Sequence, residues 1–295
     1  MHKWIISIIS LCLFAMFFGQ ELYSDHGRTV LITGASHGIG LATAERLAKN
    51  GHKVYAMTRN PSTAMDLQAL AINNPLVVIR QLDITDTVSV ESAIQKILEE
   101  EGSIFAVINN AGFGIFGPTE MHTLEEIQQL FETNFFGAIR VINAVLPSMR
   151  ERREGRILNL SSISGVVPSK GMPIYSATKF ALEAISASYA NDLSPWNIKV
   201  SLIQPGPVVT DFESSTCYGT RLAKEENPYL DILFSRRQSW KQVMDSGQAP
   251  DEIAAVIQTV LQDPHPNLWV QTSPSVSGIM ENHYKDLSGN VRIPH

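Results

Sequence analysis

A glycine-rich turn between a strand pattern and a helix pattern constrains the fold of this chain most strongly. Residues 29–33 form a short β-branched run, the turn reads Gly34-Ala-Ser-His-Gly-Ile-Gly40, and residues 41–50 have a helical pattern. Glycines let such a turn tighten and let the backbone approach a pyrophosphate, whose charge the N-terminus of the helix stabilises. The spacing is a variant of the dinucleotide-binding fingerprint. The alternative is a glycine-rich helix entry with a structural role only.

The rest of the chain alternates between strand and helix patterns. Strands are predicted over residues 29–33, 53–58, 76–82, 104–109, 156–161, 199–204 and 268–271, and helices over 41–50, 88–101, 123–150 and 175–192. Strands separated by helices are joined by right-handed crossovers into a parallel sheet. The sequence therefore predicts an α/β fold, a single doubly wound Rossmann-type sheet of about seven strands with helices on both faces. Neither an internal repeat nor a linker divides residues 28–295.

Composition excludes several classes of protein. The 295 residues are 44% hydrophobic and 18% charged, which excludes a disordered chain. The net charge of -6 argues against a nucleic-acid partner. The two cysteines, Cys12 and Cys217, are too few for a disulfide framework or a zinc site, and the eight histidines show no metal-ligand spacing. No metal is predicted.

The N-terminus carries an apolar run at residues 4–18, broken only by Ser7 and Ser10. It fits the core of a signal peptide and is shorter than the roughly 20 residues that span a bilayer. No small-x-small cleavage site follows it. We therefore predict that residues 1–27 are a hydrophobic signal or anchor segment that attaches the protein to a membrane, whose side stays open. The alternatives are a cleaved signal, giving a secreted or lumenal protein, a segment lying in the interface, and a buried helix.

The end of the second strand indicates the form of the dinucleotide. NAD enzymes normally place a carboxylate there for the adenosine ribose. This chain instead has Met57-Thr58-Arg59-Asn60, with one arginine and no acidic residue. A guanidinium group can bind a 2′-phosphate through two hydrogen bonds. The sequence favours NADP(H), and the alternative for Arg59 is a solvated loop side chain.

Three further residues suit acid–base chemistry on an alcohol or carbonyl. Tyr175 and Lys179 share one face of a predicted helix, because they are four residues apart. A nearby cation favours the phenolate, so we expect a lowered pKa for Tyr175, which suits proton transfer. Ser162 follows the strand 156–161, so its hydroxyl is expected in the crevice at the carboxyl edge of the sheet.

The chain resembles the short-chain dehydrogenase/reductase family over about residues 28–290. The matching motifs are Thr33–Gly40, Asn109–Gly112, the tetrad Asn134, Ser162, Tyr175 and Lys179, and Pro205–Thr210. Within the family it is similar to the hydroxysteroid and retinol dehydrogenase branch, over residues 54–59, 175–182, 201–207 and 270–273.

The resemblance implies a role for each matched residue. Tyr175 gives or takes the hydroxyl proton, and Ser162 hydrogen-bonds the carbonyl oxygen. Lys179 binds the nicotinamide ribose, and Asn134 anchors a water relay. The implied cofactor-binding residues are Gly34, Ser36, Gly38, Ile39, Gly40, Arg59, Asp83, Ile84, Asn110, Tyr175, Lys179, Val208 and Thr210.

A substrate lid is predicted over about residues 211–248. The segment carries apolar and aromatic residues among many polar ones: Phe212, Tyr218, Tyr229, Leu230, Ile232, Leu233, Phe234 and Trp240. Such a segment can close over an apolar ligand. The alternative is a surface helix pair whose aromatic residues lie in the core.

These features predict an NADP(H)-dependent oxidoreductase that interconverts a hydrophobic alcohol and its ketone or aldehyde. The small hydrophobic substrate is steroid-, retinoid- or lipid-like, and a homodimer is a candidate assembly. Two alternatives stay open: a non-catalytic NADP(H)-binding redox sensor, and a reductase of acyl-thioesters or sugars. The second alternative is compatible with four basic residues of the predicted lid: Arg221, Lys224, Arg236 and Arg237.

Overall fold

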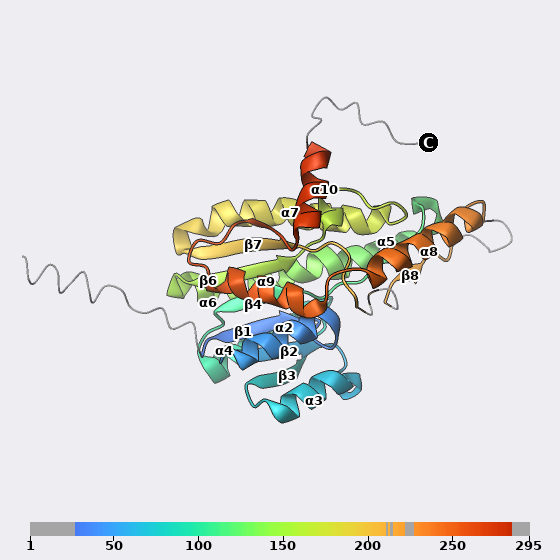
Figure 1. Ribbon diagram of the computed structural model, residues 1–295. Coiled ribbons are helices and arrows are strands. Elements are labelled where there is room, and N and C mark those ends of the chain that lie inside the picture. Colours follow the sequence, from blue (N-terminus) through green and yellow to red (C-terminus); the bar gives the residue numbers. More distant parts are fainter. Residues whose placement is uncertain (1–26, 211, 213–214, 222–226, 285–295) are drawn as a thin grey trace, which may run out of the picture.

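The computed structural model describes residues 27–210, 212, 215–221 and 227–284. Its main sheet consists of seven parallel strands in the order β3-β2-β1-β4-β6-β7-β9 (Figure 1). The strands are β1 (Thr29–Thr33), β2 (Lys53–Thr58), β3 (Val77–Gln81), β4 (Ala106–Asn109), β6 (Gly155–Leu160), β7 (Ile198–Gln204) and β9 (Trp269–Gln271). The predicted doubly wound, Rossmann-type sheet is confirmed.

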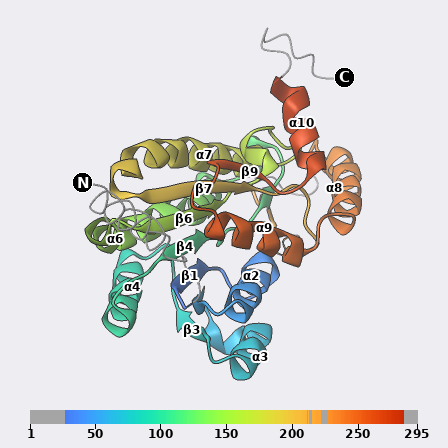
Figure 2. The same cartoon turned by 60° about the vertical axis from the view of Figure 1, so that its left-hand side comes forward.

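Both faces of the sheet are buried, so its central strands are apolar throughout. Side chains alternate along β1: Val30 and Ile32 belong to one core, and Leu31 belongs to the other. The first core is covered by α2 (Gly38–Lys49), α3 (Met65–Asn73) and α9 (Pro250–Gln262). The second is covered by α4 (Thr87–Glu101), α6 (Gly137–Arg152) and α7 (Pro173–Leu193). Figure 2 shows α4 and α6 on one side of the sheet and α2 and α9 on the other.

The predicted helix over residues 123–150 is wrong as a single element. The structure has α5 (Leu124–Phe131), a π-helical turn η3 (Glu132–Phe136) and then α6. A capping box opens α5: the Thr123 hydroxyl accepts from the Glu126 N–H, and the Glu126 carboxylate accepts from the Thr123 N–H. The π-helical turn contains Asn134, whose side chain bonds to two distant segments described below.

Several elements were not predicted from the sequence. They are the two-stranded sheet of β5 (Ile115–Phe116) and β8 (Cys217–Tyr218), the helices α3, α8 (Leu230–Asp245), α9 and α10 (Pro274–Tyr284), and the short helices η1 (Pro61–Thr63), η2 (Thr119–Met121), η4 (Ile163–Gly165) and η5 (Ser194–Trp196). Strands of two residues leave no periodic signal, because their pairing is decided by tertiary contact.

The N-terminal apolar run at residues 4–18 lies outside the described residues. Within the ranges that the structure describes, none of the helices is both long and apolar enough to cross a membrane.

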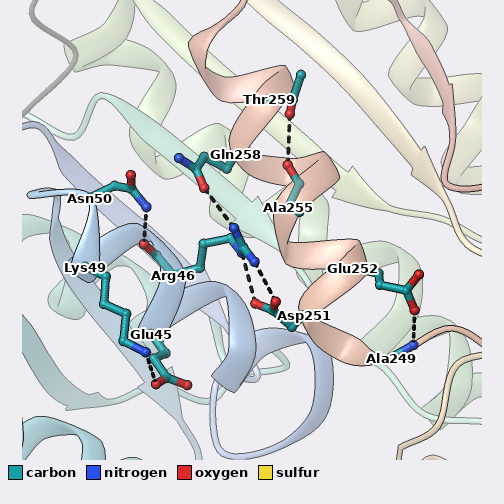
Figure 3. Close-up of polar contacts among 10 residues, drawn as sticks. All are labelled: Glu45, Arg46, Lys49, Asn50, Ala249, Asp251, Glu252, Ala255, Gln258 and Thr259. Atoms are coloured by element: carbon teal, nitrogen blue, oxygen red, sulfur yellow. Dashed lines mark hydrogen bonds and ion pairs between the residues drawn. The ribbon is translucent and has the colours of Figure 1, made fainter.

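Helices α2 and α9 pack side by side and are also joined by a polar link (Figure 3). Arg46 donates from Nε to Asp251 Oδ1 at 2.9 Å and from Nη2 to Asp251 Oδ2 at 2.5 Å. Its Nη1 donates to Gln258 Oε1 at 3.4 Å. The bond from Arg46 lowers the pKa of Asp251. Because the Asp251 side chain is 67% exposed, solvent weakens this ion pair.

We therefore expect core packing, and not the ion pair, to hold α2 in place. Asp251→Asn should lower the free energy of unfolding by less than about 1 kcal/mol at pH 7. A carboxylate whose folded pKa is depressed stabilises fully above its unfolded pKa, so this loss should shrink as the pH falls below about 4 and vanish below the lowered folded pKa. Leu47→Ala, at a fully buried position of α2, should cost about 2–5 kcal/mol at either pH. Urea unfolding at pH 7 and pH 3.5 measures both, and a larger cost for Asp251→Asn than for Leu47→Ala would contradict this account.

Candidate active site

A cavity of about 1140 Å³ lies at the carboxyl ends of the strands. Its lining comes from the segments that follow β1, β2, β3, β4, β6 and β7. The strand order reverses at β1 and β4, and open α/β sheets bind ligands in the crevice at such a switch point. The topology thus gathers residues from six distant parts of the chain at one edge.

The glycine-rich turn forms the wall beside α2. Gly34 and Gly38 have positive φ angles of 65° and 57°. A Cβ on Gly34 would lie 2.8 Å from Ala111 Cα, and one on Gly40 would lie 2.4 Å from the Gly34 carbonyl oxygen. The close approach therefore requires glycine at both positions.

The N-terminus of α2, which follows the glycine-rich turn, is suited to binding an anion. The N-cap residue His37 makes no side-chain hydrogen bond to the first turn of α2, and that turn holds no acidic residue. Its first N–H groups lack intrahelical partners, as at every helix start. Gly34, Ser36, Gly38 and Ile39 line the cavity, whereas Gly40 lies behind them. These residues fit a dinucleotide pyrophosphate.

The ends of β2 and β3 form the next part of the wall. Arg59 is exposed and lines the cavity, and its carbonyl accepts from Gln81 Nε2 at 3.1 Å. Burial disfavours the Asp83 carboxylate, but bonds from Thr85 N at 2.9 Å and Thr85 Oγ1 at 2.7 Å outweigh it, with help from nearby arginine charges. The pKa of Asp83 is lowered as a result. Asp83 and Ile84 both line the cavity.

Asn110 braces the glycine-rich turn. Its Nδ2 donates to the carbonyls of Thr33 at 3.0 Å and Gly34 at 2.9 Å. The backbone N–H groups of Asn110 and Ala111 both donate to Thr33 Oγ1, each at 3.0 Å. Asn110 also lines the cavity, as do Val208 and Thr210.

Ser162, Tyr175 and Lys179 meet at the inner end of the cavity. The Ser162 hydroxyl lies near the Tyr175 phenol, and this contact acts to lower the pKa of Tyr175. Lys179 Nζ lies 5.7 Å from the centroid of the Tyr175 ring and donates to the Leu160 carbonyl at 2.7 Å. The predicted Tyr175–Lys179 pair on one face of a helix is therefore present on α7.

The expected lowering of the Tyr175 pKa is not found. Burial raises the pKa of Tyr175 to about 12, although the contact with Ser162 opposes the rise. Burial also lowers the pKa of Lys179 to about 8, while the Glu183 charge opposes that fall. Desolvation of both groups thus outweighs the attraction that the sequence argument relied on.

Asn134 lies behind the cavity wall and does not line it. Its Oδ1 accepts from the Phe113 N–H at 3.1 Å, and its Nδ2 donates to the Phe113 carbonyl at 3.0 Å and to Thr178 Oγ1 at 3.2 Å. A Cβ on Gly112 would lie 3.0 Å from Asn134 Oδ1 and 3.9 Å from Lys179 Nζ. Asn134 therefore sits close to Lys179, with Gly112 between them, and its role in a water relay stays a prediction.

Part of the cavity lining is mostly apolar. Side chains there include Phe113, Met172, Phe212, Trp240, Val243 and Met244, together with the hydroxyls of Ser164, Ser169 and Ser215. The Phe212 and Tyr175 rings are in edge contact, with centroids 5.6 Å apart. Sequence reasoning did not single out Phe113 or Met172, because neither belongs to a motif of polar residues.

The predicted lid segment contributes to both the cavity and a core. Phe212, Cys217 and Trp240 line the cavity, and Leu233 packs with Ile115 and Phe116 in a core cluster that also includes Tyr175. Residues 211, 213–214 and 222–226 of this segment lie outside the described residues. The arrangement combines features of the lid and of the helix-pair alternative, and closure over a ligand stays a prediction.

Glu183 is the charged neighbour of Lys179 that sequence reasoning missed. It is buried on α7 and acts electrostatically on Lys179. Its spacing of four residues after Lys179 was the available signal. In the described part of the chain, His, Cys, Asp and Glu form no group of three or more that could hold a metal ion.

Comparison with known proteins gives consistent matches. Residues 28–218 match the family model described as short chain dehydrogenase. The chain is 35% identical over 262 residues to 3-ketodihydrosphingosine reductase of Bacteroides thetaiotaomicron, covering 89% of this chain and 94% of that protein. It is 36% identical over 276 residues to human retinol dehydrogenase 8, covering 90% and 88%. It is 33% identical over 271 residues to human 17-beta-hydroxysteroid dehydrogenase type 1, covering 88% and 82%.

A solved structure shares the fold. The short-chain dehydrogenase/reductase of Burkholderia phymatum, in complex with NAD, has a TM-score of 0.80 and 21% sequence identity, with 92% of this chain and 99% of that chain covered. Together these matches confirm the predicted resemblance to the hydroxysteroid and retinol dehydrogenase branch.

Proposed function

Because the chain belongs to the short-chain dehydrogenase/reductase family, we propose that it is an NADP(H)-dependent oxidoreductase acting on a hydrophobic alcohol or its ketone or aldehyde. The observation that carries this proposal is that Ser162, Tyr175 and Lys179 line one cavity together with a set of apolar side chains, with Lys179 Nζ 5.7 Å from the Tyr175 ring centroid. The glycine-rich turn lines the same cavity and supports a dinucleotide there.

In carbonyl reduction, Tyr175 donates its phenolic proton to the substrate oxygen. Ser162 hydrogen-bonds the same oxygen and holds it beside the phenol. The positive charge of Lys179 stabilises the phenolate that remains. When bound, the nicotinamide supplies or accepts the hydride. Because the pKa of Tyr175 is raised to about 12, the phenol keeps its proton at neutral pH and suits the acid role.

The cofactor preference rests on the end of β2. Arg59 lines the cavity where β2 and β3 end, beside Asn60 and Asp83. A guanidinium at this place can bind a 2′-phosphate, a group that NAD lacks. The other groups that would hold the cofactor are the glycine-rich turn, Asp83, Ile84, Asn110, Val208, Thr210, Tyr175 and Lys179.

The proposed substrate class rests on the apolar side chains that line the cavity. The names of the three relatives refer to a ketosphingoid base, retinol and a 17β-hydroxysteroid, which are all largely hydrophobic molecules. The six apolar side chains named above provide a surface for such a molecule. We therefore propose a steroid-, retinoid- or lipid-like substrate.

The first test is turnover and its dependence on Tyr175. We expect NADPH oxidation with at least one member of a panel of ketosteroids, retinal, long-chain ketones and acetoacetyl-thioesters. Tyr175→Phe should abolish that turnover and leave the NADPH dissociation constant within a few-fold, since the variant loses only the proton donor. Tyr189→Phe is the matched control, because Tyr189 lies on the same helix and does not line the cavity.

Each outcome of this test separates the candidate functions. Binding of NADPH with no turnover of any compound would support the redox-sensor alternative. Turnover of the thioester alone would support the polar-substrate alternative. Full activity of Tyr175→Phe would remove Tyr175 from the proposed mechanism.

The second test concerns the cofactor. A charge-assisted pair of hydrogen bonds contributes about 1.5–3 kcal/mol. Arg59→Ala should therefore weaken NADPH binding on the order of tenfold or more and leave NADH binding unchanged, as measured by fluorescence titration. Arg80→Ala is the control, because Arg80 is an exposed arginine of the neighbouring strand that pairs with Glu100. Equal losses for both cofactors in Arg59→Ala would contradict a role in reading the phosphate.

Membrane attachment through residues 4–18 is also a proposal, and the apolar run alone supports it. The full chain should pellet with membranes, whereas a chain starting at Gly27 should stay in the supernatant with its activity intact. The described fold supports this truncation point, because Gly27 N–H donates to the Gly51 carbonyl and β1 begins at Thr29. Recovery of the uncleaved full chain in the supernatant would contradict the anchor, and protease protection of vesicles would assign the side.

A further inference from the structure

Three ionisable residues follow one face of α7 at intervals of four residues. They are Tyr175, Lys179 and Glu183. Tyr175 and Lys179 line the cavity, whereas Glu183 lies one helical turn further on, 9% exposed and outside the lining. The proposed reaction uses the first two residues and leaves the third without a role.

The buried Glu183 carboxylate is held through one of its two oxygens. Gln204 Nε2 donates to Glu183 Oε1 at 3.0 Å, whereas Oε2 has no hydrogen-bond partner among the described residues. Burial raises the pKa of Glu183, while its bond with Gln204 and the charge of Lys179 oppose the rise. Gln204 is fully buried on β7, and its own Oε1 accepts from Gln271 Nε2 of β9 at 2.6 Å. Burying a carboxylate is costly unless it has hydrogen bonds and a countercharge.

Lys179 is a buried ammonium that needs a countercharge. It is 5% exposed. The elements around it bring the Leu160 carbonyl at the end of β6, the Asn134 amide of the π-helical turn and the Ser162 hydroxyl, all of which are neutral. On its own helix it faces the Tyr175 phenol and Glu183. Of the residues that the structure describes, Glu183 alone acts on Lys179 as a charge.

We propose that Glu183 is a positioning residue whose carboxylate keeps Lys179 protonated over the working pH range of the site. This inference rests on the function proposed above, because the charge of Lys179 matters there for stabilising the Tyr175 phenolate. The carboxylate acts through Lys179 and touches neither substrate nor cofactor.

The sign of the effect follows from the opposing causes. Burial lowers the pKa of Lys179 to about 8, and Glu183 raises it. A close opposite charge shifts a pKa by about 1–3 units. Removing the charge should therefore let Lys179 lose its proton at a lower pH. Tyr175 would then lack its cation between that lower midpoint and about pH 8, where Lys179 of the unmodified protein is still mostly protonated.

Glu183→Gln tests the proposal, because it keeps the shape and the acceptor for Gln204 but removes the charge. We expect the titration midpoint of Lys179 in the cofactor-free full chain to fall by about one pH unit or more. The midpoint is measured by NMR of protein labelled with ¹³Cε-lysine, and the resonance is assigned by its loss in Lys179→Arg. With the best substrate, the alkaline limb of kcat/KM should move to lower pH by a similar amount.

Two further variants control for folding. Ser186→Ala removes a fully buried hydroxyl of the same helix that accepts from Asn159 Nδ2 at 2.8 Å, but it removes no charge. It should leave the Lys179 midpoint unchanged even if it destabilises the protein. Glu183→Asp keeps a charge that is retracted by one methylene, so the midpoint should fall less, in the same direction. It provides the test if the glutamine variant does not fold.

The outcomes distinguish this inference from the proposed function. A Lys179 midpoint that moves in neither Glu183 variant overturns the inference, whether or not the protein turns over a substrate. A midpoint that moves as expected, in a protein that reduces no compound of the panel, supports the coupling of Glu183 to Lys179 and overturns the proposed enzymatic function. An equal fall in Ser186→Ala would show that helix destabilisation, not charge, moves the midpoint, and would also overturn the inference.

Discussion

The site depends on the hydrogen bonds that join the glycine-rich turn to the loop after β4. The Thr33 hydroxyl accepts from two backbone N–H groups of the β4 loop, and the Asn110 amide donates back to two carbonyls of the turn. A Cβ on Gly34 would collide with Ala111, so the two loops can meet only through glycine. This contact spans the point where the strand order reverses, and it brings the proposed dinucleotide site next to the Ser162, Tyr175 and Lys179 group.

Burial has two opposite consequences at the inner end of the cavity. It excludes water, which strengthens every polar interaction made there. It also disfavours both charged forms that the proton transfer requires, since it raises the pKa of Tyr175 and lowers that of Lys179. A buried phenol can therefore act at neutral pH as a proton donor, whereas the phenolate, which accepts a proton in the reverse direction, is favoured only if the positive charge beside it is maintained. The local balance of charge decides how far the site can serve in both directions.

Much of the fold follows from local patterns in the sequence. The strands of the main sheet are apolar because both faces are buried, so β1, β2 and β7 were predicted within one residue of their ends. The site motifs could also be recognised, because glycines with positive φ and a Tyr–Lys pair at helical spacing leave a local signature. The Ser162–Tyr175 contact joins two elements and was expected only from the crevice rule for parallel sheets.

The features that could not be predicted depend on contacts between distant segments. The helix predicted over residues 123–150 is interrupted because Asn134 bonds to Phe113 and Thr178. The residues next to Asn134 in the sequence give no indication of these partners. The expected pKa of Tyr175 had the wrong direction because the argument counted the cation and omitted desolvation, which depends on how completely the fold covers the phenol. Residue spacing specifies neighbours on a helix but does not specify burial.

The C-terminal part of the chain is connected to the site although it lies beyond the residues that match the family model. Gln248 accepts from Val209 N–H through its carbonyl at 2.9 Å and donates through Nε2 to the Thr272 carbonyl at 3.0 Å. Gln271 of β9 donates to Gln204, which donates in turn to Glu183 behind Lys179. The edge strand β9 therefore does more than complete the sheet. Gln271 of β9 orients Gln204, which holds Glu183. A substitution in β9 can therefore alter the surroundings of Lys179 although none of the cavity-lining residues is changed.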